Sequence, residues 1–218
     1  MIRGVLFDFD GLILETEGPA YQSWVEVYRE HGHELPRDRW LDYIGRESGW
    51  FDAMAHLESL VGRALDRDAV RARRDARRNA IVEGLRCMPG VREWADEAVR
   101  AGLKRAVVSS SSRAYVRTHL ERIGLVEHWD ALVCREDAPR AKPAPDLYTR
   151  ALEVVGLDAS EAIAIEDSPN GIGSAKAAGL RVVAVPNELT SALDLSRADL
   201  RLASCADVTL ADLLKKLA

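Results

Sequence analysis

The stretch Val5-Leu6-Phe7-Asp8-Phe9-Asp10-Gly11 decides how this chain folds, because it joins an apolar run directly to two carboxylates and a glycine. Side chains alternate along a strand, so Asp8 and Asp10 leave its end in the same direction. Gly11 allows the chain to turn sharply just beyond them. A carboxylate pair at the end of a buried strand needs water, a cation or a hydrogen-bonding partner. The stretch therefore predicts a functional site at the end of a buried strand, the simpler alternative being a turn with solvated aspartates.

The composition indicates a globular protein with small-molecule partners. Of the 218 residues, 47% are hydrophobic and 30% are charged, which is enough for one large core with or without a small satellite domain. The formal net charge of -5 argues against nucleic acid or an anionic membrane as the main partner, because both require a basic surface. No apolar stretch has the length of a membrane span or of a leader before Asp8, so we expect a cytoplasmic protein. The oligomeric state cannot be read from the sequence.

From about residue 88 the sequence alternates between helical and strand patterns. The expected helices, each followed by a glycine stop, are 91–101, 113–123, 146–155 and 170–178. The near-continuous apolar runs between them, typical of strands covered on both faces, are 106–108, 131–133, 162–165 and 182–185. Together with a strand at 4–7, this pattern predicts an α/β fold with a doubly wound parallel, Rossmann-like sheet. We also expect an edge strand at 207–210 before a terminal helix at 211–217.

Residues 16–86 break this alternation and indicate helices only, inserted after the first strand. One expected apolar helix face consists of Trp24, Val27, Tyr28 and His31. A second consists of Trp50, Met54, Leu57 and Val61.

The most polar part of the insertion is rich in arginine with interleaved aspartates. Its arginines are Arg67, Arg71, Arg73, Arg74, Arg77 and Arg78. The favoured interpretation is a solvated helix face with ion pairs between neighbouring turns. The alternative is that one of these arginines reaches an anionic substrate.

Three further polar clusters follow predicted strands or their connections. They are the serine run 109–112, the segment Lys142-Pro143-Ala144-Pro145-Asp146 and the segment Glu166-Asp167-Ser168-Pro169-Asn170-Gly171. Ligands of open α/β sheets bind outside the carboxyl ends of the strands. We therefore expect convergence of Asp8, Asp10, Ser110, Lys142, Glu166 and Asp167. Taken singly, a serine before a helix is usually an N-cap, and a loop lysine is usually exposed.

These residue types suit the chemistry of a phosphate ester. Asp8, Asp167 and Glu166 offer hard oxygen ligands, which suit Mg²⁺ with water and phosphate completing its shell. Lys142 adds a positive charge, and Ser110 with a neighbouring backbone N–H offers donors to phosphoryl oxygens. An aspartate can attack phosphorus to form an aspartyl phosphate while a second carboxylic acid handles the protons. Asp8 and Asp10 fit these two roles.

In order and spacing, the four motifs resemble those of the haloacid dehalogenase-like hydrolase superfamily, and most of all its β-phosphoglucomutase-like phosphatase subgroup. The resemblance implies a helical cap domain at 16–86 and an α/β catalytic core formed by 1–15 and 87–218. It implies Asp8 as nucleophile and Asp10 as general acid/base. The implied metal ligands are Asp8, Asp10 through its backbone carbonyl, Glu166 and Asp167, and the implied phosphate-binding residues are Ser110, Ser111 and Lys142.

The leading expectation is a magnesium-dependent phosphomonoesterase of a small phosphorylated metabolite. Leu12 and Glu15 replace a threonine and an aspartate that the family commonly has, both outside the implied catalytic positions. A sugar phosphomutase is the first alternative, but the histidine that mutases carry soon after this stretch is missing. A dehalogenase is disfavoured by Asp10, and a binding protein without turnover is the remaining alternative. Arg46 is the candidate for a specificity contact from the cap, with a helix-terminal salt bridge as the plainer interpretation.

Overall fold

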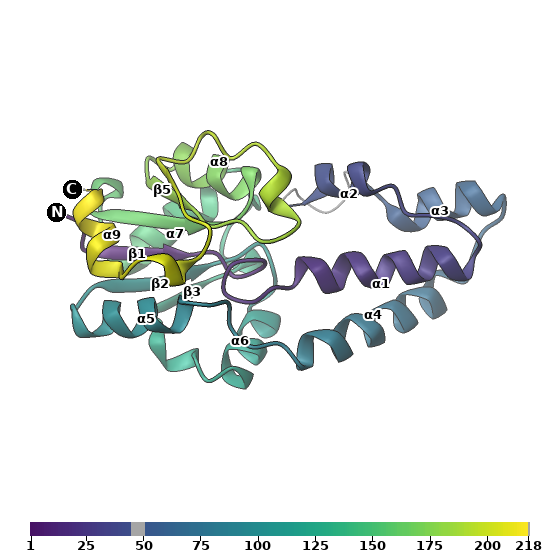
Figure 1. The fold of residues 1–218 in the computed structure, drawn as a ribbon, viewed down its shortest axis with the longest axis horizontal. Coiled ribbons are helices and arrows are strands. Elements are labelled where there is room, and N and C mark those ends of the chain that lie inside the picture. The colour runs from purple at the N-terminus through teal and green to yellow at the C-terminus, as the bar shows by residue number, and fades with distance from the viewer. Residues whose placement is uncertain (45–50, 218) are drawn as a thin grey trace.

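The computed structural model describes residues 1–44 and 51–217, and its centre is a parallel β-sheet (Figure 1). Within this part of the chain the sheet has six strands in the order β3-β2-β1-β4-β5-β6. The strands are β1 (Gly4–Phe7), β2 (Lys104–Val108), β3 (Ala131–Val133), β4 (Ala162–Glu166), β5 (Arg181–Ala184) and β6 (Leu200–Arg201). All neighbours pair in parallel. The doubly wound Rossmann-like sheet is confirmed, and its strand order reverses at β1, where such sheets bind ligands.

Helices cover both faces of the sheet. The first face carries α5 (Val91–Arg100), α6 (Arg113–Arg122) and α9 (Leu210–Lys216), and the second carries α7 (Asp146–Val155) and α8 (Pro169–Ala177). Successive strand residues alternate between them: Phe7 packs in the cluster with α5, and Leu6 packs in the cluster with α7. Because both faces are covered, strand residues of either orientation are buried, which explains the near-continuous apolar runs.

Four helices project from the carboxyl end of β1, away from the sheet, and are called the cap helices here (Figure 1). They are α1 (Glu17–Glu30), α2 (Arg37–Tyr43), α3 (Ala53–Val61) and α4 (Arg67–Glu83). They bury a separate apolar cluster that includes Val27, Tyr28, Met54 and Leu57, as their spacing predicts. His31 instead lies half-buried at the end of α1, with its Nδ1 2.8 Å from the Val27 carbonyl oxygen. Trp50 lies outside the described residues.

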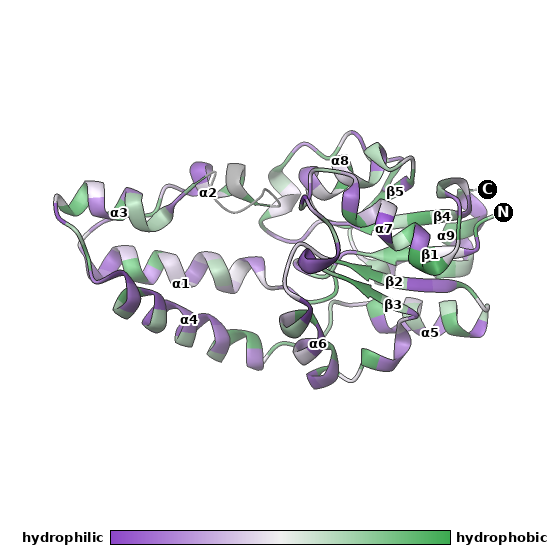
Figure 2. Cartoon of the chain, turned by 180° about the vertical axis from the view of Figure 1, so that it is seen from behind, coloured by the Kyte–Doolittle hydropathy of each residue, from purple (hydrophilic) through white to green (hydrophobic). Residues whose placement is uncertain are grey.

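Hydropathy differs clearly between the strands and one of the cap helices (Figure 2). The strands are predominantly apolar, whereas α4 is predominantly hydrophilic. Only two residues of α4, Val70 and Val82, are buried. None of the described helices combines the length and the apolar composition that crossing a membrane requires.

The predicted edge strand at 207–210 is wrong. The edge strand is β6 at Leu200–Arg201, and the later segment is divided between a 3₁₀ turn at Cys205–Asp207 and the first residue of α9. Two capping motifs account for the difference: Ser204 Oγ accepts from Ala206 N, and Thr209 Oγ1 accepts from Asp212 N. The intervening Val208 carbonyl accepts from Trp94 Nε1 at 2.9 Å. Local side-chain capping thus replaces sheet pairing here.

The turn before α5 depends on the close approach of two backbone segments. Gly90 has a φ of 82°, and a Cβ at this position would lie 2.2 Å from the backbone nitrogen of Ala206. Gly156, which ends α7, has a similar φ of 69°, but a Cβ there would have no neighbour within 4 Å. The two glycines therefore share a left-handed conformation and differ in crowding.

We predict that Gly90→Ala destabilises the protein more than Gly156→Ala. Both variants pay roughly 1 kcal/mol for a left-handed alanine, and Gly90→Ala adds about 1–3 kcal/mol because the helix and the turn must move apart. For a chain of this size, thermal denaturation should show a loss of about 2–4 °C for Gly156→Ala and at least twice that loss for Gly90→Ala. Equal melting temperatures for the two variants would show that the turn is not tightly packed.

Candidate active site

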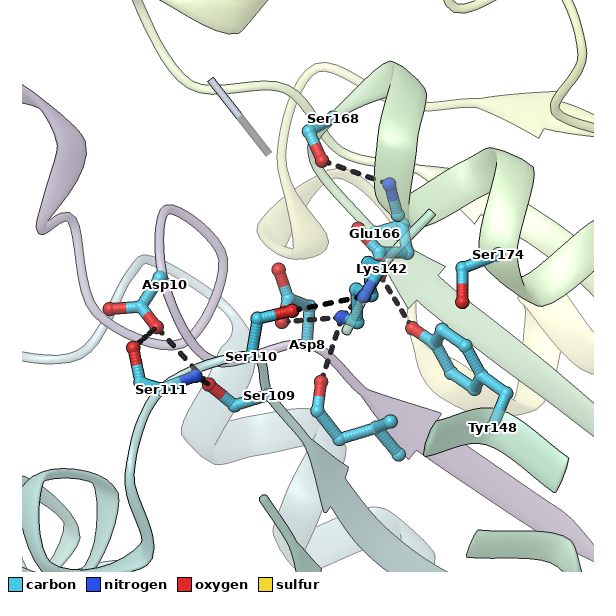
Figure 3. Close-up of polar contacts among 12 residues, drawn as sticks. Asp8, Asp10, Ser109, Ser110, Ser111, Lys142, Tyr148, Glu166, Ser168 and Ser174 are labelled. Atoms are coloured by element: carbon cyan, nitrogen blue, oxygen red, sulfur yellow. Dashed lines mark hydrogen bonds and ion pairs between the residues drawn. The ribbon is translucent and has the colours of Figure 1, made fainter. Parts of the chain in front are cut away.

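The polar residues that follow the strands meet at one edge of the sheet (Figure 3). Asp8 follows β1, the serine run follows β2, and Glu166 is the last residue of β4. Lys142 comes from the connection between β3 and α7. The strands are parallel, so their carboxyl ends lie together, and the convergence expected from the sequence is present in the structure.

Lys142 is the centre of the cluster. Its buried Nζ donates to Asp8 Oδ1 at 2.7 Å, to Glu166 Oε1 at 2.7 Å and to the Val108 carbonyl oxygen at 2.8 Å. An ammonium has three N–H donors, and all three are accepted within the protein. Burial alone would lower the pKa of Lys142, but the charges of Asp8 and Glu166 outweigh it and raise the pKa. Lys142 is therefore a fixed positive charge that orients one oxygen of Asp8.

Asp8, Glu166 and Asp167 form a buried acidic cluster whose oxygens lie within 4.8 Å of one another. Burial, reinforced by the charge of Glu166, raises the pKa of Asp8 to about 7. Burial also raises the pKa of Asp167 well above its usual value, and the charge of Asp8 adds to the effect. One lysine cannot neutralise three carboxylates, so the ionised cluster needs further positive charge.

The donor set of this cluster fits a hard divalent cation. Its atoms are carboxylate oxygens, which Mg²⁺ prefers over nitrogen or sulfur ligands. Glu166 Oε2 is buried and, among the described residues, accepts no hydrogen bond. A buried acceptor without a donor is costly unless a ligand completes it.

Two residues that the sequence analysis did not single out hold these acids in place. Tyr148 OH donates to Glu166 Oε1 at 2.7 Å, and Asn187 Nδ2 donates to Asp167 Oδ2 at 2.8 Å. Asn187 follows β5, so the rule that ligands gather at strand ends could have found it. Tyr148 lies inside α7, where no comparable signal marks it. Gly11 is required here, because a Cβ on it would lie 2.4 Å from Asp167 Oδ2.

Asp10 has its own set of donors, apart from the lysine (Figure 3). Thr16 Oγ1 donates to Asp10 Oδ1 at 2.8 Å, and Ser111 Oγ donates to Asp10 Oδ2 at 2.7 Å. Ser109 Oγ adds a longer contact of 3.2 Å to the same Oδ2. Ser110 is exposed, and its Oγ accepts from the backbone nitrogen of Lys142 at 3.3 Å. The Asp10 carboxyl group is thus held in one orientation, and Ser110 keeps its own hydroxyl proton for another acceptor.

A cavity of about 800 Å³ lies between the cap helices and the edge of the sheet. This volume is typical of small-molecule sites. Its polar floor includes Asp8, Asp10, Ser110, Lys142 and Asp167. Its cap wall is aromatic and cationic, with the residues Trp24, Trp40, Phe51, Arg71, Arg74 and Arg78. The acids and the lysine therefore face a space that a small molecule can enter.

Glu17 also lines this cavity, a position that the sequence analysis did not predict. Burial raises the pKa of Glu17 to about 8, with the charge of Asp10 as the next cause. The only sequence feature that pointed to Glu17 was its position two residues after Glu15, in the segment that continues the first motif. Arg46, the predicted specificity residue, lies outside the described residues.

Comparison with known proteins identifies the family. A family model described as haloacid dehalogenase-like hydrolase matches residues 5–185. YhcW of Bacillus subtilis (strain 168) is 38% identical over 217 residues, which cover 100% of this chain and 98% of YhcW. Hexitol phosphatase B of Escherichia coli (strain K12) is 31% identical over 217 residues, covering 98% of this chain and 97% of that protein.

A solved structure extends the likeness to the whole fold. CbbY from Rhodobacter sphaeroides in complex with xylulose-(1,5)bisphosphate has a TM-score of 0.77 and 26% sequence identity. The alignment covers 98% of this chain and 99% of CbbY. With the match of the family model, this chain belongs to the haloacid dehalogenase-like hydrolases.

Proposed function

We propose that this protein is a magnesium-dependent phosphomonoesterase that acts on a small phosphorylated metabolite through an aspartyl-phosphate intermediate. The observation that carries this proposal is the environment of Asp8. Its buried carboxylate faces the cavity, with one oxygen fixed by Lys142 and a second acid, Asp10, two residues away. A fixed nucleophile beside a separate proton donor is the arrangement that two-step phosphoryl transfer requires.

In the first step Asp8 Oδ2, the oxygen not held by Lys142, attacks phosphorus while the bond from phosphorus to the leaving oxygen breaks. Asp10 gives its proton to that oxygen. In the second step a water attacks the aspartyl phosphate and Asp10 takes a proton from it. The bond from phosphorus to Asp8 then breaks and inorganic phosphate leaves. The donors from Thr16 and Ser111 keep Asp10 oriented for both proton transfers.

The remaining site residues have supporting roles in this proposal. Asp8, the backbone carbonyl of Asp10, Glu166 and Asp167 would hold Mg²⁺, which supplies charge neutralisation for the anionic substrate. Ser110 lines the cavity, and within the described parts of the chain its hydroxyl proton has no acceptor, so we assign it to a phosphoryl oxygen. Lys142 contributes mainly its charge, because its three donors are already accepted. Ser111 would act on the phosphate side through Asp10 rather than directly.

The relatives support the same substrate class. A hexitol phosphatase and a protein solved with a sugar bisphosphate are both similar to this chain along nearly its whole length. A phosphorylated sugar or polyol is therefore the first class of substrate to test. The cap helices, which line the cavity opposite Asp8, would select the leaving group.

We predict that Asp8→Asn lowers kcat on p-nitrophenyl phosphate with MgCl₂ by about 10³-fold or more, because an amide cannot serve as the nucleophile. Asp10→Asn should lower kcat by about 10²–10⁴-fold. On a substrate whose leaving group needs no proton, it should also accumulate phosphorylated protein, which intact-mass spectrometry detects. Asp68→Asn is the control, since Asp68 is exposed in the first turn of α4.

Equal rates for Asp8→Asn and the parent protein would rule out Asp8 as the nucleophile. Isomerisation of β-glucose 1-phosphate without phosphate release, with a trace of the bisphosphate present, would instead identify a phosphomutase.

We further predict that MgCl₂ raises the melting temperature more at pH 8 than at pH 5.5. Asp8 has a pKa raised from 3.8 to about 7, so the folded metal-free protein keeps a proton that the unfolded chain has lost. This contribution to stability declines as the pH rises through that interval. A bound cation competes with the proton for Asp8, so the stabilisation that Mg²⁺ gives to the folded protein increases as the pH rises and Asp8 loses its proton. Asp167→Asn should reduce the response and Asp68→Asn should not. A response independent of pH would argue against a metal on Asp8.

A further inference from the structure

The arginines of α4 contact side chains of other helices. Arg77 donates a hydrogen bond to Glu30 of α1, and Arg73 lies 3.9 Å from the same glutamate. The Arg78 guanidinium instead lies over the ring of Tyr115 of α6, 6.0 Å from its centroid. Ion pairs between neighbouring turns, which the sequence analysis favoured, are also present within α4. At Tyr115 the cap therefore contacts the core.

Tyr115 belongs to the core and faces the cavity. It lies in the first turn of α6, directly after the serine run, and its backbone nitrogen donates at 3.3 Å to Ser112 Oγ, which caps the helix. Its side chain lines the same cavity as Asp8 and Asp10. The helix follows β2, which pairs with β1, so the sheet that carries the acids also sets the position of this phenol.

Aromatic contacts fix the orientation of the Tyr115 ring. The ring of Phe9 meets it edge to face, with 6.1 Å between centroids, and the ring of His119 does so at 4.5 Å. Edge-to-face pairs are favourable arrangements of aromatic rings, and a guanidinium over a ring is attracted to it. With Phe9, His119 and Arg78 around it, the ring has little freedom, and its hydroxyl has a defined position in the cavity.

The hydroxyl of Tyr115 is not engaged by the protein. Tyr28 OH donates to the Ala53 carbonyl and Tyr148 OH donates to Glu166, both at 2.7 Å. Within residues 1–44 and 51–217, the Tyr115 hydroxyl makes no hydrogen bond, and it is not a buried atom. Buried tyrosine hydroxyls usually have a hydrogen-bond partner in the protein. This one is open to the cavity, where a ligand can supply the partner.

The phenol lies near Asp10. Burial raises the pKa of Tyr115, and the charge of Asp10 is the next cause. Because the effect of a charge declines with distance, the phenol is close to this acid. Both Asp10 carboxylate oxygens already accept hydrogen bonds, from Thr16 and Ser111. Tyr115 is therefore a protonated donor beside the group that would protonate the leaving oxygen.

We propose that the Tyr115 hydroxyl donates a hydrogen bond to a substrate hydroxyl on the carbon next to the one that carries the phosphate. The inference rests on the proposed phosphatase function and adds to it a substrate class, phosphate esters with a vicinal hydroxyl. In that function the leaving oxygen lies at Asp10, so the neighbouring carbon and its substituent come closest to Tyr115. A neutral phenol suits a neutral hydroxyl, since each can both donate and accept. The phosphoryl oxygens would meet Ser110 and the charge of Lys142 instead.

Two esters that differ by one hydroxyl test the inference. They are 2-hydroxyethyl phosphate and ethyl phosphate, and the measurement is kcat/KM with MgCl₂ for the parent protein, Tyr115→Phe and the control Tyr21→Phe. Tyr115→Phe removes the hydroxyl and keeps the ring on Phe9 and His119. Tyr21 is also half-buried and packs against an aromatic ring, that of Trp40 at 5.8 Å, but it does not line the cavity.

We expect Tyr115→Phe to lower kcat/KM for 2-hydroxyethyl phosphate about 3- to 10-fold and to keep that for ethyl phosphate within about twofold of the parent value. One neutral hydrogen bond is lost with the first ester and none with the second. Measuring both esters with each protein cancels the intrinsic difference between their leaving groups. Tyr21→Phe should keep the parent ratio. An equal loss on both esters would indicate a structural role alone, and unchanged values would exclude the contact; either result overturns the inference.

Binding of unreactive analogues separates this inference from the phosphatase proposal. If neither these esters nor p-nitrophenyl phosphate is hydrolysed, the phosphatase proposal fails. The contact is then decided by calorimetric titration, with MgCl₂, of 3-hydroxypropylphosphonate and propylphosphonate, in which a methylene replaces the ester oxygen. Tighter binding of the hydroxylated phosphonate that is lost in Tyr115→Phe and kept in Tyr21→Phe supports the contact. Equal affinities in the parent protein, or the same preference in Tyr115→Phe, refute it whatever the catalytic result.

Discussion

The buried contact of Lys142 with Asp8 and Glu166 is the interaction on which the candidate active site depends. It joins three segments that are distant in the sequence, the ends of β1 and β4 and the connection after β3. Removal of one partner from such a buried ion pair destabilises a folded protein by about 3–5 kcal/mol, because the remaining charges stay desolvated. The lysine therefore fixes the geometry of the acids, and it leaves a net negative cluster whose oxygens would suit a divalent cation.

The sheet makes this contact possible. With β1 in the centre and the strand order reversing beside it, the carboxyl ends of β2, β1 and β4 lie next to one another. The cap helices follow β1 in the chain and lie over its carboxyl end. The cavity therefore has the acids on its floor and side chains of the cap helices on its wall. Asn170 Nδ2 donates to the Ile44 carbonyl at 3.0 Å and connects α8 to the end of α2. Fold and cap thus enclose one site.

The sequence predicted the parallel sheet and the convergence of Asp8, Lys142 and Glu166, because strand ends in such a sheet must meet. It did not predict the edge strand correctly, because the composition of residues 207–210 resembles that of a strand. The local structure there is instead determined by side-chain caps, in which Ser204 and Thr209 accept hydrogen bonds from the backbone. It also missed Tyr148 and the division of the α4 arginines. Both depend on how a helix is rotated against its neighbours, and tertiary packing sets that rotation.

The two sides of α4 have separate tasks, and this has a consequence for how the protein can change. The pairs of Arg73 and Arg77 with α1 hold the helix in place, whereas Arg71, Arg74 and Arg78 face the cavity. Replacements on the cavity side leave the bracing pairs untouched. A substitution at Arg71 would therefore change the cavity wall at little risk to the architecture, a form of evolvability that a single shared face would deny.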